Sequence, residues 1–380
     1  MFTGISTSGN SENILSDTMV AKALGIKVIG LTGAGKGGIT KVDDVVAKVA
    51  ETELYMIQKY YLPVYHCGCL MLEDNFFGKN CEVKSMVAIV LVNFNGADDT
   101  IECISSLESL IYKDYQIIVV DNCSTDDSPG KLKVAQQNHR FILLTSQENR
   151  GFSAGNNIGI KYAQEHNVDY YWLLNNDTLV EPDTLDQLLE GFSNNSACGV
   201  TTGKIYYEKN RSVIWYAGGS MNPHTARTEH WSYGKEDEDE ATYPQKVTFV
   251  TGCCMCISSQ VIDKIGMLDE SYFLYEEDAE YSFRICEAGF DIVYIPDAVI
   301  YHKVSASTGQ ASPLSQYYTI RNKYRLIHQH FKGINKWIAY LYSTLQMFFR
   351  CFKGELNLKY YFLATKAFRN TEAGKSETVQ

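Results

Sequence analysis

Between residues 86 and 177, apolar blocks alternate with mixed polar segments in a regular way. Four short apolar runs have the length and β-branched content of buried strands, and they cover residues 87–93, 116–121, 141–144 and 169–174. After the first run, apolar residues recur at helical spacing from Ile101 to Leu110. Strands that alternate with helices predict an α/β domain, with a parallel sheet covered by helices on both faces.

Each of the four predicted strands is followed by polar or ionisable residues. These segments are Asn93–Gly96, Asp121–Asp126, Asn149–Asn157 and Asn175–Asp177. Taken alone, Asn175, Asn176 and Asp177 are explained equally well by a local turn before a helix. Because the carboxyl ends of parallel strands meet at one edge of an open sheet, four such segments in succession favour a binding site there.

The residue types at these strand ends suit a nucleoside diphosphate. Asp121 can accept hydrogen bonds from a base or ribose, and the planar guanidinium of Arg150 suits a carbonyl or phosphate. Asp177 would repel a diphosphate unless it holds Mg²⁺ or Mn²⁺, which bridges carboxylate and phosphate oxygens. We therefore expect a nucleotide ligand bound together with a divalent cation.

The pattern becomes less regular after residue 200. Further apolar runs predict a strand with a tight turn over residues 213–220 and strands over residues 246–256, 291–296 and 299–302. Glu276, Glu277 and Asp278 open a helix, either as favourable charges at its N-terminus or to provide a general base. Arg284, on the same helix, is expected to pair with an acidic neighbour. His302 is either a structural histidine or the partner of an Asp in a metal shell.

The first 80 residues follow a separate pattern. Strands are predicted at residues 2–6, 27–31 and 45–49, and helices at 12–23 and 53–73. The Ser- and Thr-rich loop before the first helix offers hydroxyls and free amides to an anion. Residues 30–38 imitate two phosphate-binding glycine motifs, but Gly37 replaces the magnesium-binding Ser or Thr and no helical pattern follows. We therefore expect a simple glycine turn there.

Composition and charge narrow the class of protein. The net charge of −11 excludes nucleic acid as the main partner, because no basic field is available to gather phosphates. We expect no membrane span and no signal peptide, and hence a cytoplasmic protein with reduced thiols. The cysteine clusters at 67–69 and 253–256 lack a second pair at metal-binding spacing, which favours buried thiols.

The C-terminal region predicts a helical tail. It begins near Tyr317 and contains a strongly apolar segment, Trp337–Phe349, with Lys336, Arg350 and Lys353 beside it. This segment is too short to span a bilayer. It either packs on the preceding domain or lies on the inner face of the cell membrane as an interfacial helix.

In their order and spacing, the motifs of residues 86–310 resemble glycosyltransferase family 2, with the GT-A fold, in its rhamnosyltransferase-like branch. The residues that carry the resemblance are Asn93–Gly96, Asp121–Asp126, Asn149–Phe152, Asn175–Asp177, Glu277–Asp278 and His302. The resemblance implies inverting transfer of a sugar, rhamnose or a similar one, from a nucleoside-diphosphate sugar. It also implies a glycan or lipid-linked acceptor of the cell-surface polysaccharide or lipopolysaccharide kind.

The same resemblance implies roles for individual residues. The nucleotide sugar would be bound by five of them, namely Asn93, Asp121, Arg150, Asn176 and Asp177. Asp177 would be the last Asp of the metal-binding DxD motif, which reads Asn-Asn-Asp here, and His302 would contact the metal or diphosphate. Asp278 would be the catalytic base, which acts on the acceptor from the face opposite the leaving diphosphate.

A second resemblance covers the start of the chain. Residues 6–11 and 28–32, with Gln58 and His66, resemble the C-terminal half of a sugar isomerase (SIS) domain of the phosphoheptose isomerase kind. It implies a phosphosugar site in which Ser6, Ser8 and Ser11 grip the phosphate and Gln58 and His66 reach the active site. The half of that domain that carries the catalytic Glu is missing, so activity would need a partner chain. A vestigial fusion and a docking surface are the alternatives.

Three regions are expected from these patterns. They are a partial SIS segment over residues 1–80, a GT-A domain over 81–310 and a helical region over 311–380. An oligomer formed through the SIS segment is one possibility. The alternative to a glycosyltransferase is a phosphosugar isomerase, or a phosphosugar-binding protein, whose transferase domain only binds.

Overall fold

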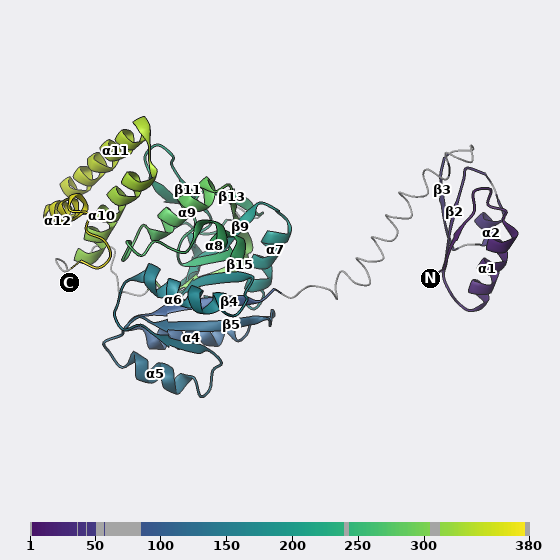
Figure 1. Ribbon diagram of the computed structural model, residues 1–380, viewed down its shortest axis with the longest axis horizontal. Coiled ribbons are helices and arrows are strands. Elements are labelled where there is room, and N and C mark those ends of the chain that lie inside the picture. The colour runs from purple at the N-terminus through teal and green to yellow at the C-terminus, as the bar shows by residue number, and fades with distance from the viewer. Residues whose placement is uncertain are drawn as a thin grey trace. The chain divides into compact units, whose positions relative to one another are not determined.

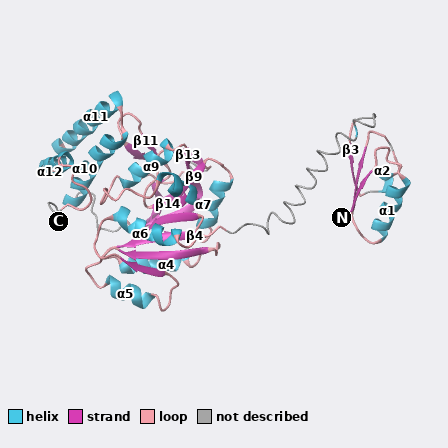
Figure 2. Cartoon of the chain, viewed as in Figure 1, coloured by secondary structure: helices cyan, strands magenta, loops and turns pink. Residues whose placement is uncertain are grey.

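The computed structural model describes residues 2–35, 37–42, 44–50, 57, 85–238, 243–304 and 312–376. The chain divides into two compact units, residues 1–84 and residues 85–380 (Figure 1). Each unit combines strands with helices, as the colouring by secondary structure in Figure 2 shows. The two units are therefore described one at a time.

The first unit contains a small parallel sheet. Its strands are β1 (Phe2–Ile5), β2 (Val28–Thr32) and β3 (Val45–Lys48), in the order β1-β2-β3. Helix α1 (Glu12–Ala23) follows the Ser-rich loop, and the one-turn helix α2 (Ile39–Val42) follows the glycine turn. The sequence predicted no helix after those glycines. The helix predicted over residues 53–73 lies outside the described residues, except for the buried Ile57.

The second unit is built on a ten-stranded sheet. Eight of its strands follow the order β13-β15-β9-β14-β7-β4-β5-β6, and the other two, β10 and β8, pair with β9 and β15. Its parallel part consists of β4 (Val87–Asn93), β5 (Tyr115–Asp121), β6 (Ile142–Thr145) and β7 (Tyr170–Asn175). Side chains of β4 are almost all buried, as expected for a central strand covered on both faces. The four predicted strands and their parallel pairing are confirmed.

The rest of this sheet is mixed. Its strands are β8 (Thr178–Val180), β9 (Cys198–Tyr207), β10 (Asn210–Tyr216), β13 (Gln245–Val247), β14 (Cys254–Ser258) and β15 (Asp291–His302). Strand β14 runs antiparallel to β7, whereas β15 runs parallel to β9. A separate hairpin joins β11 (Gly219–Met221) to β12 (Thr228–His230).

Two sequence predictions need correction in this part. The apolar run 246–256 is two short strands, because the chain leaves the sheet after Val247 and rejoins it at Cys254. Residues 291–302 form one continuous strand instead of two. The register shift between Ile295 and Val299 accommodates Pro296, which has no N–H to give to a ladder.

Helices cover the sheet and close the domain. They are α4 (Ala97–Leu107), α5 (Ser128–Ala135), α6 (Phe152–Gln164), α7 (Thr184–Ser193), α8 (Ser259–Ile265) and α9 (Glu277–Glu287). Helix α6 lies very close to β4, since a Cβ on Gly159 would collide with the side chain of Val90. This close approach brings the N-terminus of α6 to the edge of the sheet where β4 ends.

The C-terminal helices form their own group beside this domain, at one end of the unit (Figure 1). They are α10 (Pro313–His330), α11 (Gly333–Phe352) and α12 (Leu358–Arg369). A separate apolar cluster joins them to the loop before α9 through Phe273, Tyr317 and Tyr318. No helix in the described parts of the chain is long and apolar enough to cross a membrane.

The cysteines of the second unit are thiols. Cys253, Cys254 and Cys256 are buried at the start of β14, and burial raises the pKa of each. Among the described residues these cysteines form no disulfide, and no metal-binding cluster is found. The predicted buried thiols are therefore confirmed for 253–256, whereas Cys67 and Cys69 lie outside the described residues.

Candidate active site

Asp121, at the end of β5, is buried in a hydrogen-bonded cluster. Its Oδ1 accepts from Asn93 Nδ2 at 2.8 Å and from Ser124 Oγ at 2.6 Å, and its Oδ2 accepts from Ser124 N at 3.2 Å. Only 1% of its surface is exposed. Asn93 ends the neighbouring strand β4, so the two predicted donor-binding residues are brought together. The carboxylate is oriented by the protein before any ligand arrives.

Asn176 extends this cluster to the end of β7. Its Nδ2 donates to Thr100 Oγ1 at 2.8 Å, and Thr100 in turn donates to Asn93 Oδ1 at 2.9 Å. Thr100 belongs to α4, so the first turns of this helix connect two strand ends. The sequence left open whether Asn176 touches the ligand or only shapes the turn, and in the structure its side-chain amide donates to Thr100.

The segment after β6 connects the strand ends to a distant loop. Asn122 Nδ2 donates to Asn149 Oδ1 at 3.1 Å and to the Gly151 carbonyl at 3.0 Å. Gly151 has φ 96°, and a Cβ there would collide with the carbonyl oxygen of Phe273. Phe152 N donates to that same oxygen at 3.0 Å. A glycine is therefore required where the loop before α9 crosses the N-terminus of α6.

Arg150 lies apart from the buried cluster. Its Nη2 is 2.9 Å from Glu270 Oε2, and its side chain is 57% exposed. The side chain of its neighbour Asn149 contacts Asn122 instead. Of the five predicted donor-binding residues, Arg150 is the one that the structure places in a surface ion pair.

Asp177 and His302 meet where β7 and β15 end. His302 Nε2 is 3.2 Å from Asp177 Oδ1, and their side chains are only 8% and 15% exposed. The imidazole packs edge-on against Trp215, with ring centroids 4.7 Å apart. Strand β15 pairs with β8 in such a register that His302 lies opposite Thr178, and Thr178 is the residue that follows Asp177 in the chain. The structure thus brings together both predicted metal ligands.

Asp278 lies in the first turn of α9. Its Oδ2 accepts from Gly252 N at 3.2 Å and its Oδ1 from Ala279 N at 2.8 Å. Burial raises the pKa of this carboxyl above the usual aspartate range, although the two N–H donors act in the opposite direction. Burial and the charge of Asp278 also raise the pKa of Glu277. A carboxylate with a raised pKa is suited to accept a proton.

The backbone before Asp278 is strained and is held by α10. Tyr275 and Glu276 both have positive φ values, 67° and 68°, which non-glycine residues rarely adopt. Asn322 Nδ2 donates to the carbonyls of Leu274 and Tyr275, both at 2.9 Å. Lys323 Nζ is 2.6 Å from Glu276 Oε2 and donates to the Ala226 carbonyl at 2.9 Å.

Sequence analysis gave no role to Asn322 or Lys323. The available signal was the run of three consecutive polar residues from Arg321 to Lys323 in the middle of α10, and Asn322 and Lys323 are both buried in the structure. Arg321 beside them is fully buried against Tyr317 and Tyr318. These side chains connect the C-terminal helices to the loop that carries Asp278.

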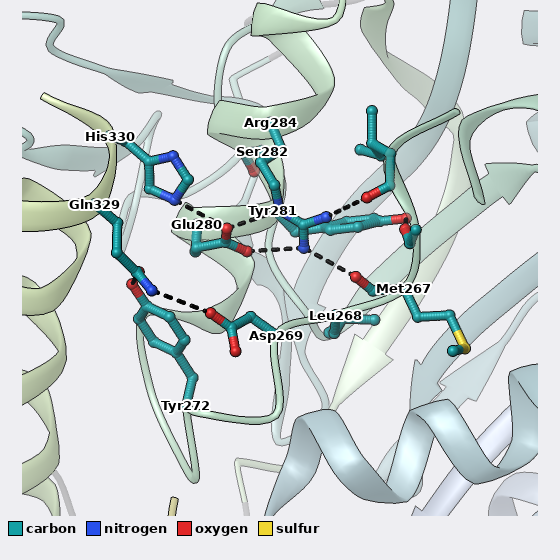
Figure 3. A network of polar contacts seen from close by, with 12 residues as sticks. Met267, Leu268, Asp269, Tyr272, Glu280, Tyr281, Ser282, Arg284, Gln329 and His330 are labelled. Atoms are coloured by element: carbon teal, nitrogen blue, oxygen red, sulfur yellow. Dashed lines mark hydrogen bonds and ion pairs between the residues drawn. The ribbon is translucent and has the colours of Figure 1, made fainter. Parts of the chain in front are cut away.

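A polar network anchors the other end of this region (Figure 3). Glu280 forms two bonds to Arg284, Nε to Oε1 at 2.7 Å and Nη2 to Oε2 at 2.9 Å. His330 Nε2 lies 2.9 Å from Glu280 Oε1, and Arg284 also donates to the carbonyls of Ile265 and Met267. The expected acidic partner of Arg284 is therefore Glu280, and the network ties α9 to the C-terminus of α10.

Asn175 and Asp278 bond to consecutive residues of one short segment. Gly252 donates its N–H to Asp278, and the carbonyl of Cys253, the next residue, accepts from Asn175 N at 3.0 Å. The negative charge of Asp177 also contributes to the raised pKa of Cys253. The ends of β4, β5, β7 and β15 and the start of α9 are thus connected by a chain of contacts and form one candidate site.

The residues at this site fit a divalent cation in part. A carboxylate and an imidazole converge at Asp177 and His302, and both are ligand types that Mn²⁺ accepts. Within the described parts of the chain, no group of three or more His, Cys, Asp or Glu forms a complete metal shell. A cation held here would need further ligands from diphosphate oxygens or water.

The predicted phosphosugar site is only partly described. Ser6 Oγ accepts from Ser11 N at 3.3 Å, and Ser8 Oγ accepts from Asn10 N at 3.2 Å. These hydroxyls are engaged within their own loop. Gln58 and His66 lie outside the described residues.

Relatives with known activities match this chain. The N-acetylglucosaminyl-diphospho-decaprenol L-rhamnosyltransferase of Mycobacterium tuberculosis is 24% identical over 318 residues, which are 78% of this chain and 99% of that protein. The poly-beta-1,6-N-acetyl-D-glucosamine synthase of Staphylococcus aureus is 24% identical over 230 residues. That match covers 60% of this chain, and the chain spans about half of the synthase, 53% of its length.

The fold also matches a solved structure and a family. The crystal structure of GalNAc-T7 with UDP, GalNAc and Mn²⁺ aligns with a TM-score of 0.53 at 16% identity, over 65% of this chain and 49% of that one. Residues 88–266 match the model of Glycosyl transferase family 2. The mixed α/β domain therefore has a GT-A-like fold, and the chain is a glycosyltransferase.

Proposed function

We propose that this glycosyltransferase moves a sugar, with inversion, from a nucleoside-diphosphate sugar to a glycan or lipid-linked acceptor. The observation that carries the proposal is the single site formed by four strand ends and the start of α9. It places Asp121 in a preformed cluster, pairs Asp177 with His302 and holds Asp278 beside Gly252.

Donor binding is assigned to the strand ends. Asp121 would accept hydrogen bonds from the nucleobase, with Asn93 and Asn176 fixing its surroundings. Arg150 would break its ion pair with Glu270 and bind the donor instead. This exchange is feasible because an exposed ion pair contributes little stability. Asp177 and His302 would hold Mg²⁺ or Mn²⁺. When bound, the cation would neutralise charge on the leaving diphosphate.

The acceptor reaction is assigned to Asp278. Its carboxylate would take the proton of the acceptor hydroxyl as that oxygen attacks the anomeric carbon. Its raised pKa makes it a stronger base than an ordinary aspartate. Attack from the face opposite the leaving diphosphate inverts the anomeric configuration.

Rhamnose is the first candidate for the donor sugar. Support comes from the mycobacterial relative, whose name gives L-rhamnosyl transfer to an N-acetylglucosaminyl-diphospho-decaprenol. The acceptor would accordingly be a lipid-linked intermediate of a surface polysaccharide or lipopolysaccharide. The alternative, a phosphosugar isomerase, gains no support from the described residues, because Gln58 and His66 lie outside them.

The test of this proposal is the Asp278→Asn variant. We expect kcat for sugar transfer to fall by about 10²–10⁴-fold, the usual contribution of a general base. The affinity for the nucleotide sugar with Mn²⁺ should stay unchanged, because Asp278 serves the acceptor. Donor binding is measured by calorimetry, and transfer by release of nucleoside diphosphate across a panel of donors.

The matched control is Asp297→Asn, which changes an exposed aspartate on β15. It should leave both transfer and binding as in the wild type. Unchanged turnover in Asp278→Asn would overturn the assignment of the base.

A further inference from the structure

Helix α11 has an exposed apolar face along its whole length. Large apolar side chains recur there every three or four residues, which places them on one side of a helix. They are Ile334, Trp337, Ile338, Leu341, Leu345, Phe348, Phe349 and Phe352, exposed by between 41% and 90%. Isolated exposed apolar residues are common on soluble domains, but a continuous stripe of this length marks an interaction surface.

The opposite side of α11 is the one that packs on the protein. Its buried residues are Ala339, Ser343 and Met347, which lie one helical turn apart. At 100° per residue, their mean direction is opposite to that of the exposed stripe. The helix is thus already docked through one face while the other remains apolar. In Figure 1 it lies on the outer side of the C-terminal group.

Helix α12 extends this apolar face. Leu358 and Phe362, one turn apart on α12, are 48% and 62% exposed. The rings of Phe348 on α11 and Tyr361 on α12 are 5.2 Å apart, and Tyr361 contacts the ring of Phe362. The two helices therefore present one surface, which we name the α11–α12 face.

The segment that contains this face differs in charge from the rest of the protein, and Lys353 lies over the ring of Phe349 in the stripe. Between residues 332 and 370 there is one acidic residue, Glu355, against seven basic ones, whereas the whole chain has a net charge of −11. The basic residues are Lys332, Lys336, Arg350, Lys353, Lys359, Lys366 and Arg369. An apolar stripe accompanied by Lys and Arg is typical of helices that lie in the plane of a bilayer surface.

We propose that the α11–α12 face docks this protein on the surface of an anionic lipid bilayer. The apolar side chains would enter the boundary between headgroups and acyl chains, with Trp337 at the level of the headgroups. Lys353 and Lys359, which lie over aromatic rings of α11 and α12, would contact lipid phosphates. A second copy of the chain is a poorer occupant, because two faces of the same positive sign would repel each other.

This inference goes beyond the sugar-transfer reaction and does not depend on the identity of Asp278 as the base. It would place the enzyme at the surface where a lipid-linked acceptor is found. Its failure and that of the proposed function are therefore separable, since vesicle binding and donor turnover are measured independently.

The experiment uses the full chain with two kinds of vesicle, phosphatidylcholine alone and phosphatidylcholine with phosphatidylglycerol. We expect co-sedimentation with the anionic vesicles, weakening as salt screens the basic residues. In the variant Trp337→Glu/Leu341→Glu, partition should fall at least about tenfold, because two apolar anchors are replaced by anions. Lys353→Glu/Lys359→Glu should weaken binding to anionic vesicles alone.

The control is Ile111→Glu, which changes an isolated apolar residue that is 62% exposed outside the C-terminal helices. It should bind vesicles as the wild type does, and all variants should keep wild-type turnover with a water-soluble acceptor. Absence of wild-type binding to anionic vesicles would overturn the proposal, as would equal binding by Trp337→Glu/Leu341→Glu. A wild-type dimer that this double variant dissociates would assign the face to a second copy instead.

Discussion

Burial controls the ionisation of the carboxyls that open α9. Glu277 is 8% exposed, and among the described residues its Oε2 has no hydrogen-bond partner. Both its burial and the neighbouring charge of Asp278 raise its pKa. Two adjacent buried carboxyls resist being ionised together, so one of them tends to keep its proton. The burial that raises the pKa of Asp278 therefore also lowers the stability of the folded protein.

The consequence for stability can be measured in Glu277→Gln. The folded-state pKa of Glu277 is raised above its unfolded value, so its contribution to stability is present at low pH and is lost as pH rises through the folded pKa. The side-chain amide of Glu277→Gln cannot ionise, so the variant does not lose this stability as pH rises. We expect the free energy of unfolding at pH 8 to rise by at least about 1 kcal/mol. Near pH 4 the difference should disappear.

The matched control is Glu287→Gln, which changes an exposed glutamate on the same helix. Its free energy of unfolding should follow the wild type at both pH values. Urea titrations at each pH give these free energies, and a Glu277→Gln variant less stable than the wild type at pH 8 would contradict the prediction.

Among the elements, α10 has the clearest influence on the site. Its side chains fix the strained turn at Tyr275 and Glu276, and this turn sets the direction in which α9 begins. Such strain persists only where the surroundings hold it in place. Asn322 is therefore a positioning residue for Asp278, although it belongs to a helix outside the sheet.

The variant Asn322→Ala tests this positioning. It leaves the carbonyls of Leu274 and Tyr275 without their donor, which should lower the free energy of unfolding by about 1–3 kcal/mol. Because Asp278 would shift, we expect kcat to fall by about 10–100-fold. KM for the donor should be unchanged, since Asn322 contacts none of the proposed donor-binding residues. Steady-state kinetics with varied donor separate the two parameters.

A matched change on a neighbouring helix is Gln346→Ala, at an exposed position of α11. In this variant neither kcat nor the free energy of unfolding should change. If Asn322→Ala lost stability but kept its kcat, the side chain would have a structural role only.

For the whole molecule, the coupling between the sheet domain and the C-terminal helices depends on a few buried polar contacts. The Glu280 carboxylate, 3% exposed, is shared between Arg284 on its own helix and His330 on α10. A buried carboxylate that loses its cation is costly, whereas an exposed pair contributes little. The network in Figure 3 should therefore matter for cooperative unfolding of the unit.

Arg284→Met should destabilise the protein by about 3–5 kcal/mol, because Glu280 would lose its bidentate partner. The control is Arg227→Met, which breaks an ion pair of similar length whose side chains are 51% and 50% exposed. It should cost less than about 1 kcal/mol. Chemical unfolding of both variants measures the difference, and equal losses would contradict the importance of burial.

Much of the parallel sheet could be predicted from the sequence. The runs at 87–93, 116–121, 141–144 and 169–174 became β4 to β7 with small shifts at their ends. Buried parallel strands are nearly continuous apolar runs, so the local sequence is sufficient to identify them. The break in 246–256 and the continuity of β15 through Pro296 could not be predicted, because pairing with distant strands decides both.

By itself, the sequence determined which residue types stand at the strand ends, because strand length and polarity are local properties. It placed Asn93, Asp121 and Asp177 at one edge of the sheet through the rule for parallel strands. The family resemblance implied that Asp177 and His302 share a metal, but only the tertiary structure decided their direct contact, the pairing of Arg150 with Glu270 and the support that Asn322 gives to the turn before Asp278. These contacts join residues far apart in the chain, and no spacing in the sequence encodes them.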